Sequence, residues 1–185
     1  MKRYLSIAIL LVFSCVLTTN SYGQSDSLTV VIIRHGEKPK VGNNLSCKGF
    51  NRSLQIPKSL DSQFRVASFV YVPRIKVGSN TSSVRMFQTI TPYAVKHSLA
   101  VNSFYKETDH VNVATDVKTR KGIVLMVWEH TNIQGLAQAL GASNAPAWNG
   151  KDFDSIWVIT YNNKVATLDT TTHKEAIMPS SQCNL

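Results

Sequence analysis

One short segment near the amino terminus constrains the fold more than any other part of the sequence. Residues 28–33 are almost continuously apolar and mostly β-branched. This pattern predicts a strand that is buried on both faces of a parallel sheet. The apolar run ends abruptly at residues 34–37, which read Arg-His-Gly-Glu. Because ligand sites in parallel sheets gather at the carboxyl ends of strands, we expect a functional site at this point.

The residues at this strand end suit the chemistry of a phosphate ester. The guanidinium of Arg34 offers a planar fork of donors for phosphate oxygens. The imidazole of His35 is a nucleophile that can attack phosphorus. Gly36 allows a sharp turn and a close approach of a ligand to the backbone. These residue types in this order therefore favour a phosphate site.

Strands and helices alternate along the rest of the chain. Further strands are predicted at residues 68–72, 74–77, 100–104, 122–128, 154–161 and 164–168, the last pairing antiparallel across Asn162-Asn163. Helices are predicted at residues 47–56, 81–96, 111–119 and 131–140. We expect the first helix to be capped by Ser46 and stopped by Pro57. The alternation predicts an α/β fold, a three-layer α/β/α sandwich with a mostly parallel central sheet.

Arg-His-Gly-Glu after a hydrophobic strand resembles the signature of the histidine phosphatase superfamily, which includes the phosphoglycerate mutase-like proteins. The sequence Leu-Ser-x-x-Gly-x-x-Arg at residues 45–52 resembles the helix that follows in that family. Residues 79–89 resemble its Ser-rich turn into a helix that reads Arg-x-x-Gln-Thr. A Ser/Thr-rich loop before a helix is also, by itself, a natural anion site.

A second buried strand, residues 122–128, is followed by Glu129 and His130. This arrangement mirrors the first motif and resembles the second catalytic histidine of the family. The resemblance implies that Arg34, His35, Arg85 and His130 form one phosphate pocket. Two guanidiniums and two imidazoles provide the fixed positive charge and the donors that a transferred phosphoryl group requires.

The resemblance also implies a two-step mechanism. His35 attacks phosphorus and forms a phosphohistidine, an acid protonates the leaving oxygen, and water hydrolyses the intermediate. Arg34 and Arg85 bind the phosphoryl oxygens, and His130 donates to them. His35 needs one free ring nitrogen, so we expect a backbone carbonyl to hold the proton on the other.

The resemblance leaves the general acid open. One branch of the family supplies a glutamate after the Arg-x-x-Gln-Thr helix and the strand that follows, and Glu107 lies in that region, with Asp109 as the alternative. The other branch carries an aspartate after the second histidine, but here Thr131 takes that position. We therefore predict Glu107 as the catalytic acid. Both carboxylates can equally be ordinary loop residues.

Several other polar residues are weaker candidates. Glu37 and Arg52 are predicted at the substrate site, although Glu37 can instead orient the pocket and Arg52 can be a surface residue. The remaining histidines lack comparable settings and are interpreted as surface or structural residues: His97, His110 and His173.

Residues 1–23 are interpreted as a signal peptide, because Lys2 and Arg3 precede an apolar stretch at residues 7–17 that is too short to span a membrane. Cleavage is expected before Gln24. A lipoprotein signal with Cys15 as the lipidated residue is the less favoured alternative. We expect a periplasmic or secreted protein that consists of one domain, residues 24–185, with no stable membrane insertion after the signal is removed.

The composition indicates which classes of ligand the protein can bind. The net charge of +9 fits an anionic ligand, but no basic block interleaved with aromatic residues argues for nucleic acid. No cysteine or histidine cluster has metal-ligand spacing, and we expect neither a metal nor another cofactor. Cys47 and Cys183 can form a disulfide in an exported protein, or they can remain free thiols.

The sequence therefore predicts an exported phosphatase that hydrolyses small phosphorylated substrates. A phosphotransferase or mutase is a second enzymatic interpretation. A non-catalytic phosphate-binding protein on the same fold is an alternative from another class, and a missing pocket residue would be its sign. The substrate stays open among sugar phosphates, envelope glycans, phosphopeptides and other organic phosphates.

Overall fold

The computed structural model describes residues 27–78 and 80–183. The predicted signal peptide, its cleavage point before Gln24, the alternative lipidation of Cys15, and Ser79 of the Ser-rich turn lie outside the described residues. In the part of the chain that is described, no helix is long and apolar enough to cross a membrane.

The centre of the molecule is a six-stranded sheet in which the order is β3-β2-β4-β1-β5-β6. The first four strands in this order are parallel, and β5 and β6 form an antiparallel hairpin at one edge. The strands are β1 (Leu28–Arg34), β2 (Phe69–Tyr71), β3 (Val101–Asn102), β4 (Gly122–Trp128), β5 (Ser155–Asn162) and β6 (Val165–Lys174). The predicted α/β class and mostly parallel sheet are confirmed.

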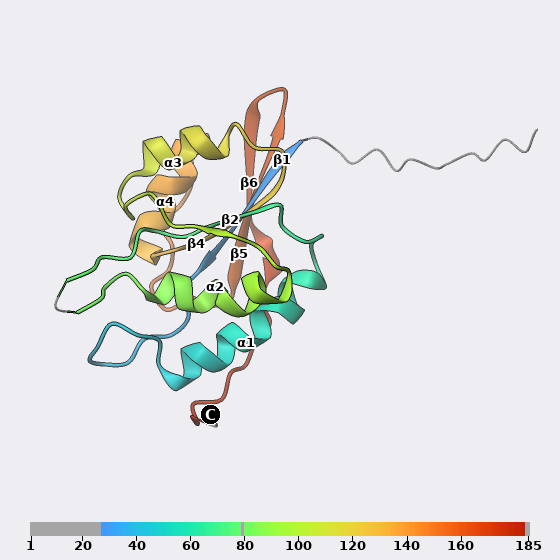
Figure 1. Ribbon diagram of the computed structural model, residues 1–185. Helices are drawn as coiled ribbons and strands as arrows, with labels where there is room; N and C mark the ends of the chain where they lie inside the picture. Colours follow the sequence, from blue (N-terminus) through green and yellow to red (C-terminus); the bar gives the residue numbers. More distant parts are fainter. Residues whose placement is uncertain (1–26, 79, 184–185) are drawn as a thin grey trace, which may run out of the picture.

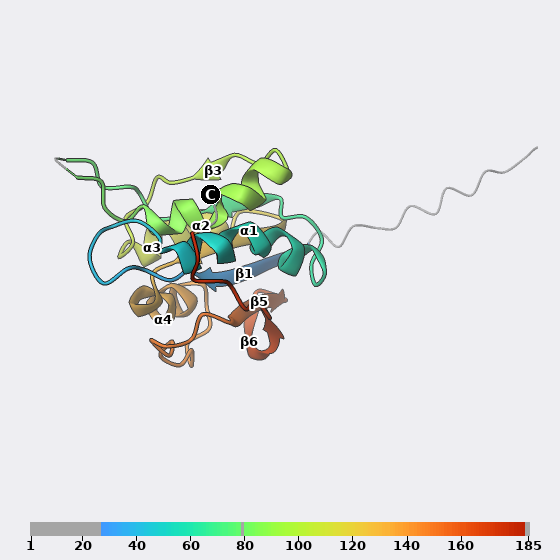
Figure 2. The ribbon, with the colours of Figure 1, turned by 90° about the horizontal axis from the view of Figure 1, so that it is seen from below.

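Two helices pack on each face of this sheet, which gives three layers (Figure 1). One face is covered by α1 (Cys47–Asp61) and α2 (Arg85–Lys96), and Figure 2 is seen from this side. The other face is covered by α3 (His110–Val117) and α4 (His130–Ala139).

The apolar pattern of β1 follows from this layering. Val30 and Ile32 pack into the core under α3 and α4, whereas Val31 and Ile33 pack into the core under α1 and α2. Each of the four is at most 1% exposed. Because both faces are covered, the strand has no polar alternation.

The first helix differs from the prediction at Pro57. It does not stop before this proline but continues to Asp61, with Pro57 inside the helix. Ile56, Pro57 and Leu60 are buried, and Ile56 and Leu60 belong to the core under this helix. Burial of this last turn offsets the hydrogen bond that the proline cannot donate.

Three further segments differ from the predictions. Residues 74–77 form no strand, apart from one isolated bridge between Lys76 and Ser82. The predicted helix at residues 81–96 begins only at Arg85. The terminal hairpin is longer than predicted, and its turn residues are Asn163 and Lys164, which both have positive φ. Two successive residues with positive φ match the twist of a two-residue hairpin turn.

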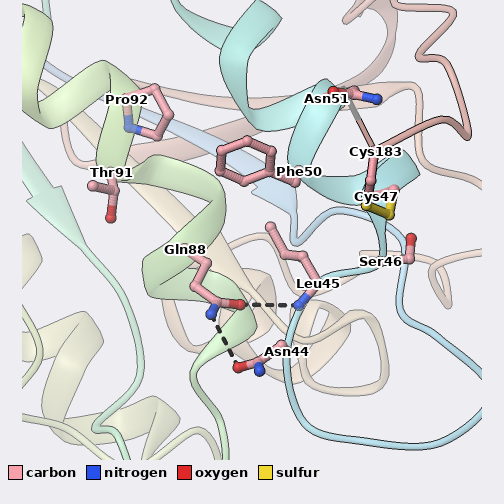
Figure 3. A pocket seen from close by; sticks show the side chains of 10 residues that line it. All are labelled: Asn44, Leu45, Ser46, Cys47, Phe50, Asn51, Gln88, Thr91, Pro92 and Cys183. Carbon is pink, nitrogen blue, oxygen red and sulfur yellow. Dashed lines mark hydrogen bonds between the residues drawn. A yellow bond between two sulfur atoms is a disulfide. The ribbon is translucent and has the colours of Figure 1, made fainter. Parts of the chain in front are cut away.

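The carboxyl-terminal tail is attached to the start of α1. Cys47 and Cys183 form a disulfide with a Cα–Cα distance of 5.0 Å, so the predicted pairing is present (Figure 3). Asn51 adds to this attachment, because its Nδ2 donates to the carbonyls of Ser180 and Gln182. The tail is therefore held beside the helix that follows the Arg-His-Gly-Glu turn.

Two glycines let α1 approach that turn. A Cβ on Gly36 would lie 2.8 Å from the carbonyl oxygen of Gly49, and a Cβ on Gly49 would lie 2.2 Å from the carbonyl oxygen of Glu37. The neighbours are backbone atoms, which cannot rotate away. The glycines of both sequence motifs are thus required by the same close contact between backbones.

We expect Gly49→Ala to lower the free energy of unfolding by about 1–3 kcal/mol, because the added methyl group overpacks a backbone contact. Gly78→Ala is the matched control, since the nearest atom to a Cβ there is 3.9 Å away. Urea unfolding of both variants measures the difference. Equal stabilities would contradict this role of Gly49.

Candidate active site

The parallel pairing of β1 with β4 brings the two sequence motifs together. Arg34 lies opposite Trp128 in the register of the two strands. Beyond the last pair, the amide of His35 donates to the carbonyl of Trp128 at 3.2 Å. The next residues, Glu129 and His130, begin α4. Both predicted histidines therefore lie at the same edge of the sheet.

His35 is held in a form that suits a nucleophile. It is 1% exposed, and its Nδ1 lies 2.7 Å from the carbonyl oxygen of Gly36. A carbonyl only accepts, so Nδ1 carries the proton and Nε2 keeps its lone pair, as expected from the sequence. Burial lowers the pKa of His35 to about 4, and the charges of Arg85 and Arg34 lower it further, although the bond to Gly36 and the charge of Glu129 oppose the shift. The imidazole is therefore neutral at pH 7.

Arg34 is fixed in place beside His35. Its Nη1 donates to the carbonyls of Gly150 at 2.8 Å and Asp152 at 3.0 Å. Its guanidinium carbon lies 3.7 Å from the centre of the Phe153 ring. Burial lowers its pKa, and the nearby carboxylate of Glu129 opposes this shift. A stacked, anchored guanidinium loses little freedom when it binds an anion.

Arg85 is the first residue of α2, and its Nη1 donates to the carbonyl of Asn43 at 3.2 Å. Within the described residues, the Nε atoms of Arg34 and Arg85 are buried without a hydrogen-bond partner. Buried donors are normally satisfied. Two such donors beside His35 are therefore consistent with a site that binds an anion.

Gln88 and Thr89 explain the rest of the Arg-x-x-Gln-Thr pattern. Oγ1 of Thr89 accepts from the amide of Gly36 at 2.9 Å and donates to the carbonyl of Arg85. Oε1 of Gln88 accepts from the amide of Leu45 at 2.9 Å (Figure 3). These two side chains tie α2 to the loops that carry the site.

The cavity in Figure 3 is separate from the predicted phosphate pocket, although Gln88 lines it. It lies between the first halves of α1 and α2, over the disulfide, and has a volume of about 380 Å³. Its lining contains none of the four predicted pocket residues. The predicted phosphate pocket therefore does not coincide with this hollow.

Glu129 is the residue that the sequence analysis missed. Its Oε1 lies 2.7 Å from Nδ1 of His130. One carboxylate oxygen of Glu129 and one ring nitrogen each of His35 and His130 lie within 4.8 Å of one another. Its position in sequence, directly after a buried strand and before His130, was the available signal.

The predicted acid, Glu107, makes different contacts. Its two carboxylate oxygens accept from Nζ of Lys76 at 2.8 Å and from Oγ of Ser83 at 3.1 Å. Its carbonyl accepts from the indole of Trp128. Asp109 precedes α3 and accepts from the side chain of Asn112. Both oxygens of Glu107 thus hold the loop that leads into α2.

Glu37 and Arg52 pair with each other. Nε and Nη2 of Arg52 donate to the two carboxylate oxygens of Glu37, and its Nη1 donates to Glu175 at 2.6 Å. Arg52 is 5% exposed, so its interpretation as a surface residue is wrong. The three side chains join the Arg-His-Gly-Glu turn, α1 and the segment after β6. These contacts give Glu37 and Arg52 a scaffolding role, and their contact with substrate stays a prediction.

The other three histidines lie elsewhere. His97 follows α2 and pairs with Asp61 at 2.9 Å, and His173 lies in β6 against Phe64. His110 is the first residue of α3.

One group of side chains has the donor types of a metal site. In the described residues, 27–78 and 80–183, one group of three metal-ligating side chains has donor atoms within 4.8 Å of one another. The group consists of His35, Glu129 and His130. The charges of Arg34 and Arg85 act on the same histidine and oppose a cation there. We assign no metal to this group.

Comparisons with known proteins identify the fold. No family model matches the sequence, and no curated protein matches it. Solved structures do match. A phosphoserine phosphatase from Entamoeba histolytica, in complex with 3-phosphoglyceric acid, aligns with a TM-score of 0.57 and 11% identity over 81% of this chain and 100% of its own.

Two further structures agree. The protein histidine phosphatase SixA, complexed with tungstate, aligns with a TM-score of 0.54 and 18% identity over 76% of this chain and 94% of its own. A phosphoglycerate mutase from Bacillus anthracis aligns with a TM-score of 0.54 and 15% identity over 80% of this chain and 94% of its own. The fold is that of the phosphoglycerate mutase-like histidine phosphatases, as the motifs predicted.

We expect the ring of His35 to titrate at about pH 4, because burial and the charges of Arg85 and Arg34 disfavour its protonated form. The chemical shift of its Cε1 proton, followed by NMR between pH 3 and 8 and assigned with His35→Ala, measures this value. A midpoint near 6.5 would mean that the ring is not shielded as the structure indicates.

Burial raises the pKa of Glu175 to about 8, although Arg52 opposes the shift. The folded chain therefore keeps a proton that the unfolded chain releases, so this group destabilises the fold as pH rises from about 4.5 to about 8. We expect Glu175→Gln to flatten that decline in urea unfolding at pH 5, 7 and 9. Glu37→Gln is the control, because Arg52 holds the pKa of Glu37 low although burial opposes this. We expect this variant to be less stable than the parent protein at pH 7, because it removes a charged partner of Arg52.

Proposed function

We propose that this protein is a phosphatase that hydrolyses phosphomonoesters through a phosphohistidine on His35. The observation that carries the proposal is the state of His35: buried, neutral, with Nδ1 bonded to Gly36 and with the charges of Arg34 and Arg85 acting on it. A neutral imidazole with a free Nε2 is a nucleophile, and the two cations attract the group that it attacks.

The reaction follows from these positions. Nε2 of His35 attacks phosphorus as the ester oxygen leaves, while Arg34 and Arg85 stabilise the charge on the phosphoryl oxygens. The bond between Nδ1 and Gly36 fixes the ring and stabilises the positive charge that it gains. Water then attacks phosphorus, the N–P bond breaks, and inorganic phosphate leaves.

The structural neighbours support this class of reaction. Their names describe a phosphoserine phosphatase and a protein histidine phosphatase, and the latter was solved with tungstate, an oxyanion shaped like phosphate. These activities belong to those proteins. For this chain they favour a small phosphorylated substrate. A non-catalytic phosphate-binding protein is disfavoured, because both histidines and Arg34 follow or end the central strands and the charge of Arg85, at the start of α2, acts on His35.

We further propose that the protein acts outside the cytoplasm, in the periplasm or after secretion. The basic residues and the apolar stretch at the amino terminus support export. The Cys47–Cys183 disulfide also fits an oxidising compartment.

The direct test is hydrolysis of 4-nitrophenyl phosphate by the chain that begins at Gln24. We expect His35→Ala to lower kcat by a factor on the order of 10⁴ or more, because the covalent intermediate cannot form. We expect His173→Ala, which changes a histidine on the edge strand β6, to keep the activity of the parent protein. Acid-labile phosphate trapped on the parent and absent from His35→Ala would identify the phosphohistidine.

Two results would contradict the proposal. The first is an activity that survives in His35→Ala. The second is a parent protein that is stabilised by phosphate in thermal unfolding but hydrolyses neither aryl nor alkyl phosphates, which is the behaviour of a binding protein.

A further inference from the structure

The Glu129–His130 pair offers a source for the proton that the leaving oxygen requires. This inference rests on the proposed phosphatase activity and deepens it. The starting observation is that the carboxylate beside the two histidines is Glu129, within 4.8 Å of both rings. The two oxygens of Glu107, in contrast, already accept from Lys76 and Ser83.

Glu129 is held as a carboxylate. It is the N-cap of α4, and its Oε2 accepts from both the amide and the hydroxyl of Thr131. Although burial opposes it, these bonds lower the pKa of Glu129, and the neighbouring His130 lowers it further. The positive end of α4 also favours a negative charge at this position. Glu129 is thus better suited to stabilise a cation than to donate a proton itself.

The two nitrogens of His130 face different groups. Nδ1 is buried and makes an ion-pair contact of 2.7 Å with Oε1 of Glu129, although this contact is not aligned as a hydrogen bond. Nε2 lies beside Gly150, since a Cβ on that glycine would be 3.6 Å from it. The carbonyl of Gly150 accepts from Arg34. One side of the ring is therefore paired with a carboxylate, and the other side lies next to the anchored guanidinium.

The charges around His130 compete. Burial, Arg34 and Lys38 outweigh Glu129, so the pKa of His130 is lowered in the protein without substrate. A dianionic phosphate ester on Arg34 and Arg85 would add negative charge on the side of Nε2 and so favour the imidazolium. Glu129 is the protein group that stabilises the same imidazolium from the side of Nδ1.

We propose that Glu129 is a positioning residue that, together with the bound phosphate ester, stabilises the protonated form of His130, so that His130 acts as the proton donor to the leaving oxygen. In the first step the His35–phosphorus bond forms, the phosphorus–ester oxygen bond breaks, and the proton on Nε2 of His130 moves to that oxygen. In the second step water attacks phosphorus, its proton passes to neutral His130, and the N–P bond breaks. The proton count is thus restored after each turnover.

The test compares substrates whose leaving groups need protonation to different degrees. A primary alkyl phosphate releases a strongly basic alkoxide, whereas 4-nitrophenyl phosphate releases a weakly basic phenolate. We expect Glu129→Gln to lower kcat/KM for the alkyl phosphate by about 10²–10³-fold, and for the aryl phosphate by less than about tenfold. The basic limb of the pH profile should move to lower pH, because His130 loses its proton more easily.

The chain offers a matched control. Asp61 and His97 form a second carboxylate–imidazole pair, 2.9 Å apart, at the carboxyl ends of α1 and α2. Asp61→Asn should leave kcat/KM for both substrates and the pH profile unchanged. Glu107→Gln tests the competing acid, and we expect it to affect both substrates alike.

A double-mutant cycle of Glu129→Gln and His130→Ala distinguishes the proposed role from a loss of activity through misfolding. His130→Ala should show the same selective loss for the alkyl phosphate, and Glu129→Gln should add little to it, because the two residues act as one unit. Independent, multiplicative losses, or equal losses for both substrates, would overturn the role of Glu129. So would a selective loss in Glu107→Gln. An inactive parent protein, or an active His35→Ala, would instead refute the phosphatase function and this inference with it.

Discussion

The site depends first on the parallel pairing of β1 with β4 at the centre of the sheet. Both strands are buried on two faces, and their register places Arg34 opposite Trp128. The residues that follow each strand, His35 and His130, then leave the sheet at the same edge. A slip of one residue in this register would turn every side chain of a strand to the opposite face. The two-sided core is therefore what determines the geometry of the site.

A second constraint holds the helices against this strand end. The backbone of α1 reaches the Arg-His-Gly-Glu turn only because Gly36 and Gly49 lack side chains. Thr89 and Gln88 tie α2 to the same region through main-chain amides. Arg52 neutralises Glu37 within the scaffold. The sequence motifs thus contain two groups of residues. A few, such as Arg34 and His35, belong to the proposed phosphate site, and a larger number hold these few in place.

The sequence predicted correctly those features that depend on residues close together in the chain. The strand at residues 122–128 and the N-cap Ser46 are present as predicted, because each depends on a short stretch of chain. The contact of Arg52 with Glu175 joins residues 123 positions apart and lies in no motif. The helix end at Pro57 was also wrong, since the core contacts of Leu60 outweigh the local preference. Glu129 was missed because the family pattern places its alternative acid after the second histidine, where this chain has Thr131, and not before it.

The proposed reaction requires opposite protonation states of the two histidines: His35 must be neutral and His130 must carry a proton. Arg34 and Arg85 help to keep His35 neutral, and the same charges would attract the phosphate ester of the proposed reaction. That field also acts against a proton on His130, whose pKa Arg34 and Lys38 lower. Glu129 lies within 4.8 Å of both rings, but its ion pair is with His130, where the proposed proton is needed. The bonds from Thr131 hold Glu129 in place. Fixing the carboxylate at the start of α4 therefore lets one small pocket contain both a neutral nucleophile and a proton donor.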